Sequence, residues 1–307
     1  MGNMKKNERK MIVLFMAPVV LIYLIFFLYP TIRTVHMSFY KVRNLASPVS
    51  EWSFIGLKNY IDLTKNPLFV ISYKNIMAIL FIGGIGVFII AFLFAGVLQK
   101  MKTKKFFRAA IYLPNVITPV ALVVMWTQYV FNSRFGFLKS FFGALGLKNL
   151  ADIPWTSPDW AFTSMMIAFC FGSVGYYMVI IMAAMDKIPK DFYECADLEG
   201  AGSFTKFFRI TLPLMKDILR TAITFWCLGA INFFLWSRVF SGSGMDPKTL
   251  SPANLMFNMI FGGSKTQQVA EHINVGMGAA IGVALCASVI LVFVILNAVI
   301  SKEKYEY

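Results

Sequence analysis

Residues 191–213 read DFYECADLEGAGSFTKFFRITLP. The stretch mixes charges of both signs with large apolar side chains, and it interrupts a chain that is otherwise almost continuously apolar. Such a mixture is typical of short amphipathic helices that lie at a membrane surface or against a soluble partner. Gly200 and Gly202 divide the run in two, and Pro213 ends its second half. Composition alone leaves two interpretations equally open, a docking segment and an ordinary solvated loop.

The composition places the chain among integral membrane proteins. Of its 307 residues, 58% are hydrophobic and only 14% are charged, and the mean hydropathy is +0.67. These values exclude an ordinary soluble domain. The net charge of +14 could indicate nucleic acid, but basic residues of membrane proteins collect in cytoplasmic loops. The four cysteines and two histidines are too scattered to predict a metal site or a disulfide framework.

Six apolar stretches have the length that a helix needs to cross a bilayer. We therefore predict an all-α protein with a cytoplasmic tail at 1–10 and a single transmembrane domain at 11–307. Its spans are expected at about 11–32, 75–99, 109–132, 161–185, 221–237 and 275–300. The first stretch could be a signal peptide, but its apolar core is too long and no small-residue cleavage site follows it.

Prolines and glycines predict how the spans bend and pack. Pro114 and Pro119 should bend the start of the third span, which membrane helices tolerate where neighbours satisfy the freed backbone groups. Close approach of a neighbouring helix is expected at Gly83, Gly84, Gly86, Gly278 and Gly282.

The distribution of positive charge predicts the orientation. Of the 29 lysines and arginines, 17 fall on the side that holds both termini, the loop at 100–108 and the polar loop at 186–220. The loops on the other side are much longer and carry fewer of them. Because cytoplasmic loops are enriched in lysine and arginine, both termini and the stretch 191–213 are predicted to be cytoplasmic.

The predicted spans contain no Asp, Glu, Lys, Arg or His. A proton-driven transporter needs such a group within the membrane, and a voltage sensor or a charged selectivity ring needs several. The sequence also contains no phosphate-binding GxxxxGK[ST] loop. Energy for active transport would therefore have to come from a separate, nucleotide-hydrolysing subunit.

The spacing within 191–213 resembles a known motif, the "EAA" loop of binding-protein-dependent ABC importer permeases. That loop reads EAA, three residues, G, nine residues, I, one residue, LP. The matching positions here are Glu194, Cys195, Ala196, Gly200, Ile210, Leu212 and Pro213. The departure is Cys195, where the family usually has alanine, but cysteine is also small and fairly apolar.

The similarity extends over most of the chain. The segments 54–60, 112–126, 135–147, 188–208 and 210–215 resemble the maltose, glycerol-phosphate and oligosaccharide branch of these permeases. Beyond Ser241 the match is looser: the family often has GGP and a threonine-rich strip, whereas this chain reads SGSGMDPKTLSP. The resemblance implies the type I ABC importer permease fold with six transmembrane helices.

The resemblance also implies a role and partners. The chain would be a transport subunit of a bacterial inner-membrane importer and not an enzyme, and it would bind no cofactor itself. It would pair with a second, homologous permease subunit, two ATPase subunits that bind ATP and Mg, and an extracytoplasmic solute-binding protein. The loop would form a coupling helix that docks on an ATPase subunit. Glu194 would contribute a salt bridge or capping contact, Ala196 close packing, and Gly200 the change of direction.

A substrate path is predicted from residue types in the fourth and fifth spans. Sugars bind to aromatic faces and to hydroxyl or amide groups, and by position these residues resemble the lumen-facing strip of a maltose-type permease. The candidates are Phe169, Ser173, Tyr176, Tyr177, Trp226, Asn232, Phe233 and Trp236. Asn232 is favoured, because an amide in hydrocarbon needs a partner. Simple packing or lipid contact remains the alternative for the aromatic residues.

Three rival functions remain at this point. A self-sufficient secondary transporter is disfavoured by the uncharged spans and by the coupling loop. An ABC permease for peptides, amino acids or phosphate is opposed only by the resemblance outside the loop. A scaffold or insertase is opposed by the aromatic and amide side chains of spans four and five.

Overall fold

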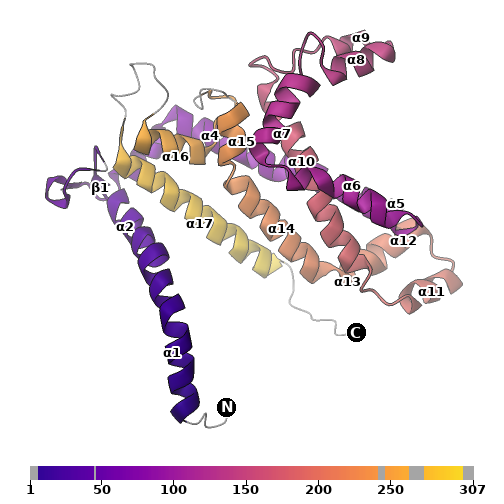
Figure 1. Ribbon diagram of the computed structural model, residues 1–307, viewed down its shortest axis with the longest axis horizontal. Coiled ribbons are helices and arrows are strands. Elements are labelled where there is room, and N and C mark those ends of the chain that lie inside the picture. The colour runs from indigo at the N-terminus through magenta and orange to yellow at the C-terminus, as the bar shows by residue number, and fades with distance from the viewer. Residues whose placement is uncertain (1–5, 45, 241–245, 263–272, 300–307) are drawn as a thin grey trace. The chain divides into compact units, whose positions relative to one another are not determined.

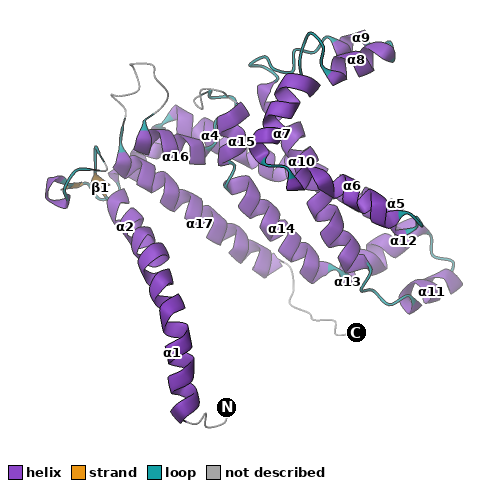
Figure 2. Cartoon of the chain, viewed as in Figure 1, coloured by secondary structure: helices purple, strands orange, loops and turns teal. Residues whose placement is uncertain are grey.

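The computed structural model describes residues 6–44, 46–240, 246–262 and 273–299 (Figure 1). Within these ranges the chain is almost entirely helical (Figure 2), and the two strands found there, β1 (Tyr40–Lys41) and β2 (Ser53–Phe54), pair antiparallel. The predicted all-α class is confirmed. Parts of the predicted tail 1–10 and the end of the predicted sixth span lie outside the described residues.

The chain divides into two compact units. One runs to Asn66 and includes Met256–Ala284, and the other comprises Pro67–Leu255 and the residues from Leu285 onward. The helices α16 (Pro252–Phe261) and α17 (Val275–Val299) contribute to both units. The prediction of one transmembrane domain at 11–307 stays a prediction.

The first unit begins with one long helical run, formed by α1 (Lys6–Tyr23), the π-helix η1 (Leu24–Leu28) and α2 (Tyr29–Ser38). It continues through β1, η2 (Val49–Glu51), β2 and α3 (Lys58–Lys65). The buried amide of Asn59 on α3 donates to the carbonyls of Ser38 and Tyr40, at 2.8 and 3.0 Å. These bonds fix the point where the long run ends, because they satisfy two carbonyls that no helix partner reaches.

The second unit is built around α10 (Ala161–Met185), which packs against α5 (Gly84–Gln99) and α6 (Lys104–Val116), as Figure 1 shows. A Cβ at Gly175 would lie 2.2 Å from the carbonyl oxygen of Ile111. Only glycine therefore allows this approach of α6 to α10. The unit also contains α4 (Pro67–Ala78), η3 (Ile79–Gly83), α7 (Pro119–Met125), η4 (Trp126–Val130), α8 (Phe137–Ala144), α9 (Lys148–Ala151), α11 (Asp191–Leu198), α12 (Ser203–Lys206), η5 (Phe207–Thr211), α13 (Leu212–Leu214), α14 (Lys216–Ile231) and α15 (Phe234–Phe240).

Four described helical runs are long and apolar enough to cross a membrane, namely Lys10–Ser38, Pro67–Gln99, Ala161–Met185 and Val275–Ala298. Two bent pairs bring the number to six if each pair is one span. The first pair joins Lys104–Val116 to Pro119–Val130 at 98°, and the second joins Lys216–Ile231 to Phe234–Phe240 at 42°. Six spans are what the sequence predicts, although several helices extend beyond the predicted bounds.

The sharp break in the third span lies at Pro119. Thr118 is extended, with ψ 143°, because a residue before proline avoids the helical region. Pro119 then opens α7 at a position where its missing N–H costs nothing. Pro114, in contrast, stays inside α6, which continues through it.

The fifth span is longer than predicted at both ends. Its helices carry Asp217 and Arg220 near the start of α14 and Arg238 in α15. The stretch 221–237 is free of charge, but the helical pair around it is not. The break between α14 and α15 falls at Asn232, which no proline or glycine marks.

Candidate functional site

The stretch 191–213 forms two short helices, α11 and α12, joined by a tight turn at Gly200. Gly200 has φ +71°, a conformation that glycine adopts without a steric penalty. The N–H of Gly200 donates to the carbonyl of Asp197 at 3.0 Å, and the N–H of Ala201 to that of Ala196 at 2.9 Å. These two bonds are the Schellman pattern that ends a helix. Gly202 then precedes α12 with an ordinary φ of −67°.

Side-chain contacts hold the two helices together across the turn. The Lys206 ammonium forms an ion pair with the Asp197 carboxylate. Tyr193 on α11 and Thr211 at the end of η5 share a hydrogen bond of 3.0 Å between their hydroxyl oxygens. The sequence alone predicts no contact among these four residues. The sequence offers one sign of the ion pair: Asp197 and Lys206 carry opposite charges and lie on opposite sides of Gly200 and Gly202.

Ile210, Leu212 and Pro213 connect this loop to the fifth span. Pro213 has no N–H, and its ring displaces the carbonyl four residues earlier, so the turn before it widens into the π-helix η5. Ile210 and Leu212 are half-buried. The chain then enters α14 through Met215, which is 1% exposed and anchors the junction in the core.

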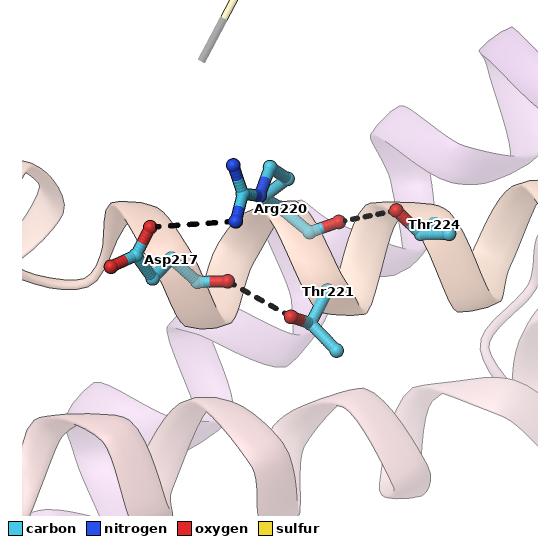
Figure 3. Close-up of polar contacts among 4 residues, drawn as sticks. All are labelled: Asp217, Arg220, Thr221 and Thr224. Carbon is cyan, nitrogen blue, oxygen red and sulfur yellow. Dashed lines mark hydrogen bonds and ion pairs between the residues drawn. The ribbon is translucent and has the colours of Figure 1, made fainter. Parts of the chain in front are cut away.

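The first turns of α14 are fixed by local polar contacts (Figure 3). The Thr221 hydroxyl donates to the carbonyl of Asp217 at 3.0 Å, and the Thr224 hydroxyl to that of Arg220 at 2.8 Å. The Arg220 guanidinium lies 3.9 Å from the Asp217 carboxylate. Asp217 also sits where the helix dipole favours a negative charge.

The polar loop exposes large apolar side chains next to its acidic ones. Leu198 is 88% exposed, Phe204 77% and Phe208 48%, while Glu194 and Cys195 are also exposed. This surface of exposed apolar and acidic side chains is what the predicted docking segment requires.

The loop is tied to its neighbour at the same end of the unit. The amide of Gln99, at the end of α5, donates to the Asp186 carboxylate at 3.1 Å, and the Lys104 ammonium lies 4.0 Å from the same group. Asp186 directly follows α10. The loop at 100–103 and the polar loop thus lie at one end of the helices, as the charge pattern predicts for two loops on one side.

Most of the predicted substrate-path residues lie together in the core of the second unit. Phe169 is at the centre, with its ring centroid 5.3 Å from that of Trp226, 4.8 Å from Phe233 and 5.5 Å from Trp236. The Tyr177 ring joins this cluster through Trp226, and the two ring centroids are 5.8 Å apart. All five are less than 10% exposed. Within this single chain their rings pack on one another.

Trp226 has a specific partner. Its indole N–H donates to the carbonyl of Leu80 at 2.9 Å, inside the π-helix η3. A Cβ at Gly84 would lie 2.5 Å from the same indole nitrogen. The expected close approach at Gly84 is thus the place where the indole of the fifth span packs on the second span.

The three remaining candidates differ from this cluster. The Ser173 hydroxyl donates to the carbonyl of Phe169 at 2.9 Å within α10, and Tyr176 is half-buried against Tyr177. Asn232 is exposed and ends α14 at the 42° break. Asn232 is therefore the most exposed of the predicted path residues.

Comparison with known proteins decides the family. The chain is 31% identical to a probable ABC transporter permease protein of Bacillus subtilis, YurN, over 78% of this chain and 81% of that protein. The chain belongs to the ABC transporter permeases. No family model matches this permease. It is also 28% identical to AraP, the arabinooligosaccharides transport system permease protein of Halalkalibacterium halodurans, over 94% of this chain and 86% of AraP.

Solved structures confirm the fold of this permease. It matches a chain in the crystal structure of a bacterial ABC transporter involved in the import of alginate, with a TM-score of 0.77, 16% identity and 95% of each chain covered. The predicted importer permease fold is confirmed. The permease is a multi-pass inner-membrane transport subunit, and members of its family are not enzymes.

Proposed function

We propose that this permease forms part of the translocation path of an ATP-driven importer for a sugar, specifically an oligosaccharide. The observation that carries the proposal is the similarity over 94% of the chain to an arabinooligosaccharide permease. A diacetylchitobiose uptake permease of Streptomyces coelicolor, 25% identical over 82% of the chain, supports the same substrate class. Asn232 would contact the sugar at the break of the fifth span.

The assembly that we propose has a second, homologous permease subunit, two ATPase subunits and an extracytoplasmic solute-binding protein. ATP and Mg would be bound by the ATPase subunits. A crystal structure of a bacterial alginate ABC transporter in complex with its periplasmic protein, at a TM-score of 0.72 to this chain, supports the proposed binding protein by analogy. The exposed apolar surface of α11 and α12 would dock on an ATPase subunit, with both chain termini on the same, cytoplasmic side.

The proposal is tested with the full complex reconstituted in proteoliposomes. Arabinotriose, chitobiose and maltotriose are offered with the cognate binding protein, and ATP hydrolysis and uptake are measured. At least one sugar should stimulate both. Stimulation by amino acids or peptides alone would contradict the sugar assignment.

The loop assignment has its own test in the same preparation. Glu194→Lys should reduce co-purification of the ATPase subunits, because it reverses a charge on the docking surface. Full uptake by an intact complex would contradict the coupling role.

A further inference from the structure

The second unit contains a polar pocket of about 420 Å³. Its wall residue Phe240 lies one helical turn after Trp236 of the aromatic cluster on α15. Its described wall comes from the end of the third span, the loop before α10, the end of α15 and the segment 246–249. Its described lining residues are Thr127, Gln128, Asn132, Ser133, Thr156, Pro158, Ala161, Phe240, Asp246 and Thr249. The volume is within the range of about 300–1,000 Å³ that small-molecule sites occupy.

The pocket lies at the opposite end of α10 from the coupling loop. Ala161 opens α10 and lines the pocket, whereas Asp186 follows the helix and contacts the loop at 100–104. A helix of 25 residues is about 37 Å long at 1.5 Å per residue, which exceeds the hydrocarbon thickness of about 30 Å. The pocket therefore opens on the extracytoplasmic side if the coupling loop is cytoplasmic.

The lining has the chemistry of a carbohydrate site. It presents hydroxyl and amide groups, which donate and accept hydrogen bonds, next to the ring of Phe240 and a single carboxylate, Asp246. None of the described lining residues is a lysine, arginine or histidine. An anionic ligand is thus disfavoured, and a neutral ligand rich in hydroxyl groups fits.

Thr249 supplies the observation that points to a ligand. It is 1% exposed, and its hydroxyl has no hydrogen-bond partner among the residues that the structure describes. Its backbone is nevertheless fixed, because its N–H donates to the carbonyl of Asp246 at 3.1 Å and its carbonyl accepts from the Ser237 hydroxyl at 2.7 Å. A buried hydroxyl without a partner is costly. Because the oxygen itself is buried, a ligand hydroxyl would remove that cost only when the Thr249 side chain turns its hydroxyl toward the pocket.

The walls are held in place by contacts outside the pocket. The amide of Asn75 on α4 donates to the carbonyls of Pro247, Lys248 and Leu250, at 3.1, 3.2 and 2.9 Å. The Lys248 ammonium also pairs with Asp159 and holds the pKa of that carboxyl below its usual value. The loop that carries Thr249 is therefore fixed before any ligand arrives, which lowers the entropic cost of binding.

We propose that this pocket is an outer sugar site, which takes one sugar unit of the substrate before it enters the membrane path. The inference rests on the proposed sugar substrate. Thr249 and Gln128 would donate or accept hydrogen bonds to sugar hydroxyls, and Phe240 would lie against the sugar ring.

The test uses the whole complex in lipid nanodiscs, without the binding protein, and arabinotriose, chitobiose or maltotriose as probes. Binding is followed by saturation-transfer NMR for the wild type, Thr249→Val and Gln128→Ala. Each variant should bind about two- to tenfold more weakly, the range that one hydrogen bond contributes. Thr64→Val, on α3, removes a hydroxyl that bonds its own helix at 2.8 Å and serves as the matched control.

Further readouts separate the possible failures. Thr249→Val should not lower the thermal midpoint, because it removes no internal hydrogen bond; a lowered midpoint would show a structural partner and overturn the proposal. Sugar-stimulated ATP hydrolysis with the binding protein present tests the transport function separately. Suppose that a sugar stimulates ATP hydrolysis by the wild type, but that the pocket variants bind this sugar as tightly as the wild type does in the NMR assay. The outer site is then refuted, and the proposed function stands. Weaker docking of the binding protein with unchanged sugar binding would also refute it.

Discussion

At the scale of single residues, Trp226 shows how a predicted path residue acquires a structural partner. Its indole N–H satisfies the Leu80 carbonyl, which the π-helical turn η3 leaves available. Gly84 leaves the space that the indole occupies. The sequence shows an aromatic residue in one span and glycines in another, but it does not show that they meet.

Gly84→Ala should destabilise the permease by about 1–3 kcal/mol, the usual cost of overpacking, because its Cβ would lie 2.5 Å from the Trp226 indole nitrogen. Trp226→Phe should cost about as much, since it leaves the Leu80 carbonyl unsatisfied. The double variant should lose less than the sum, because the phenyl ring lacks the atom that clashes. Thermal unfolding of the purified complex measures all three, and strict additivity would contradict the contact.

Gly175→Ala should be more damaging than Gly84→Ala. The added Cβ would lie 2.2 Å from a backbone oxygen of α6, and backbone moves less readily than a side chain. Gly229→Ala, on α14, is the control, because a Cβ there meets nothing within 4 Å and alanine favours a helix by about 1 kcal/mol. Expression and thermal midpoint should fall for the first variant and hold or rise for the second.

At the scale of elements, the sequence predicts some helix irregularities and not others. The π-helices η1 and η5 each end two residues before a proline, Pro30 and Pro213. A proline that lacks an N–H and crowds the preceding turn accounts for both. No proline follows η3 at that spacing. Instead, its Leu80 carbonyl accepts a hydrogen bond from the Trp226 side chain, 146 positions later in the chain. Only local causes can be read from local sequence.

The candidate site likewise contains features that local sequence predicts and features that depend on tertiary packing. The turn at Gly200 is predictable, because helix ends of this kind need a residue with positive φ. The bond between Tyr193 and Thr211 is not, since it depends on how α11 folds back on η5. Burial of the aromatic candidates likewise depends on tertiary packing, so residue type alone could not separate path from core.

Gly200→Ala should uncouple the two halves of the loop. Its φ of +71° costs a residue with a Cβ roughly 1–2 kcal/mol, so α11 would be mispositioned on its partner. Gly202→Ala is the matched control, because its φ is −67° and no atom lies within 4 Å of the added Cβ. Transport per ATP hydrolysed should fall for the first variant only; equal loss in both would contradict the turn argument.

At the scale of the whole molecule, composition and charge predict the membrane class and six spans, and the resemblance of the polar loop to the EAA motif predicts a family that the comparisons confirm. They do not predict the 98° break or the division into two compact units. The break follows from Pro119, which was expected only to bend the span. The division depends on which helices share a core, and the pattern of each helix alone does not contain that information.

The orientation is the molecular property that still rests on charge alone, and native cysteines provide its test. Cys195 is exposed on the polar helix α11. Cys286 is exposed as well, but it lies within the apolar helix α17, and Cys170 and Cys227 lie within α10 and α14. In vesicles stripped of the ATPase subunits, which would otherwise cover α11, a membrane-impermeant maleimide should therefore label inside-out vesicles and leave right-side-out vesicles almost unlabelled. Cys195→Ala, which restores the residue usual in the resembling family, should abolish that labelling and leave transport intact.

A cysteine introduced at the other end of α10 tests the same orientation from the opposite side of the membrane. On the Cys195→Ala background, Lys148→Cys, in the exposed helix α9, should be labelled only in right-side-out vesicles. The two positions lie in loops joined to opposite ends of α10, so a correctly folded span requires opposite results. Labelling of both from one side would show that α10 does not cross the membrane. If Cys195 were labelled only in right-side-out vesicles and the cysteine at position 148 only in inside-out vesicles, the orientation would be the reverse of the predicted one. The outer sugar site would then face the cytoplasm.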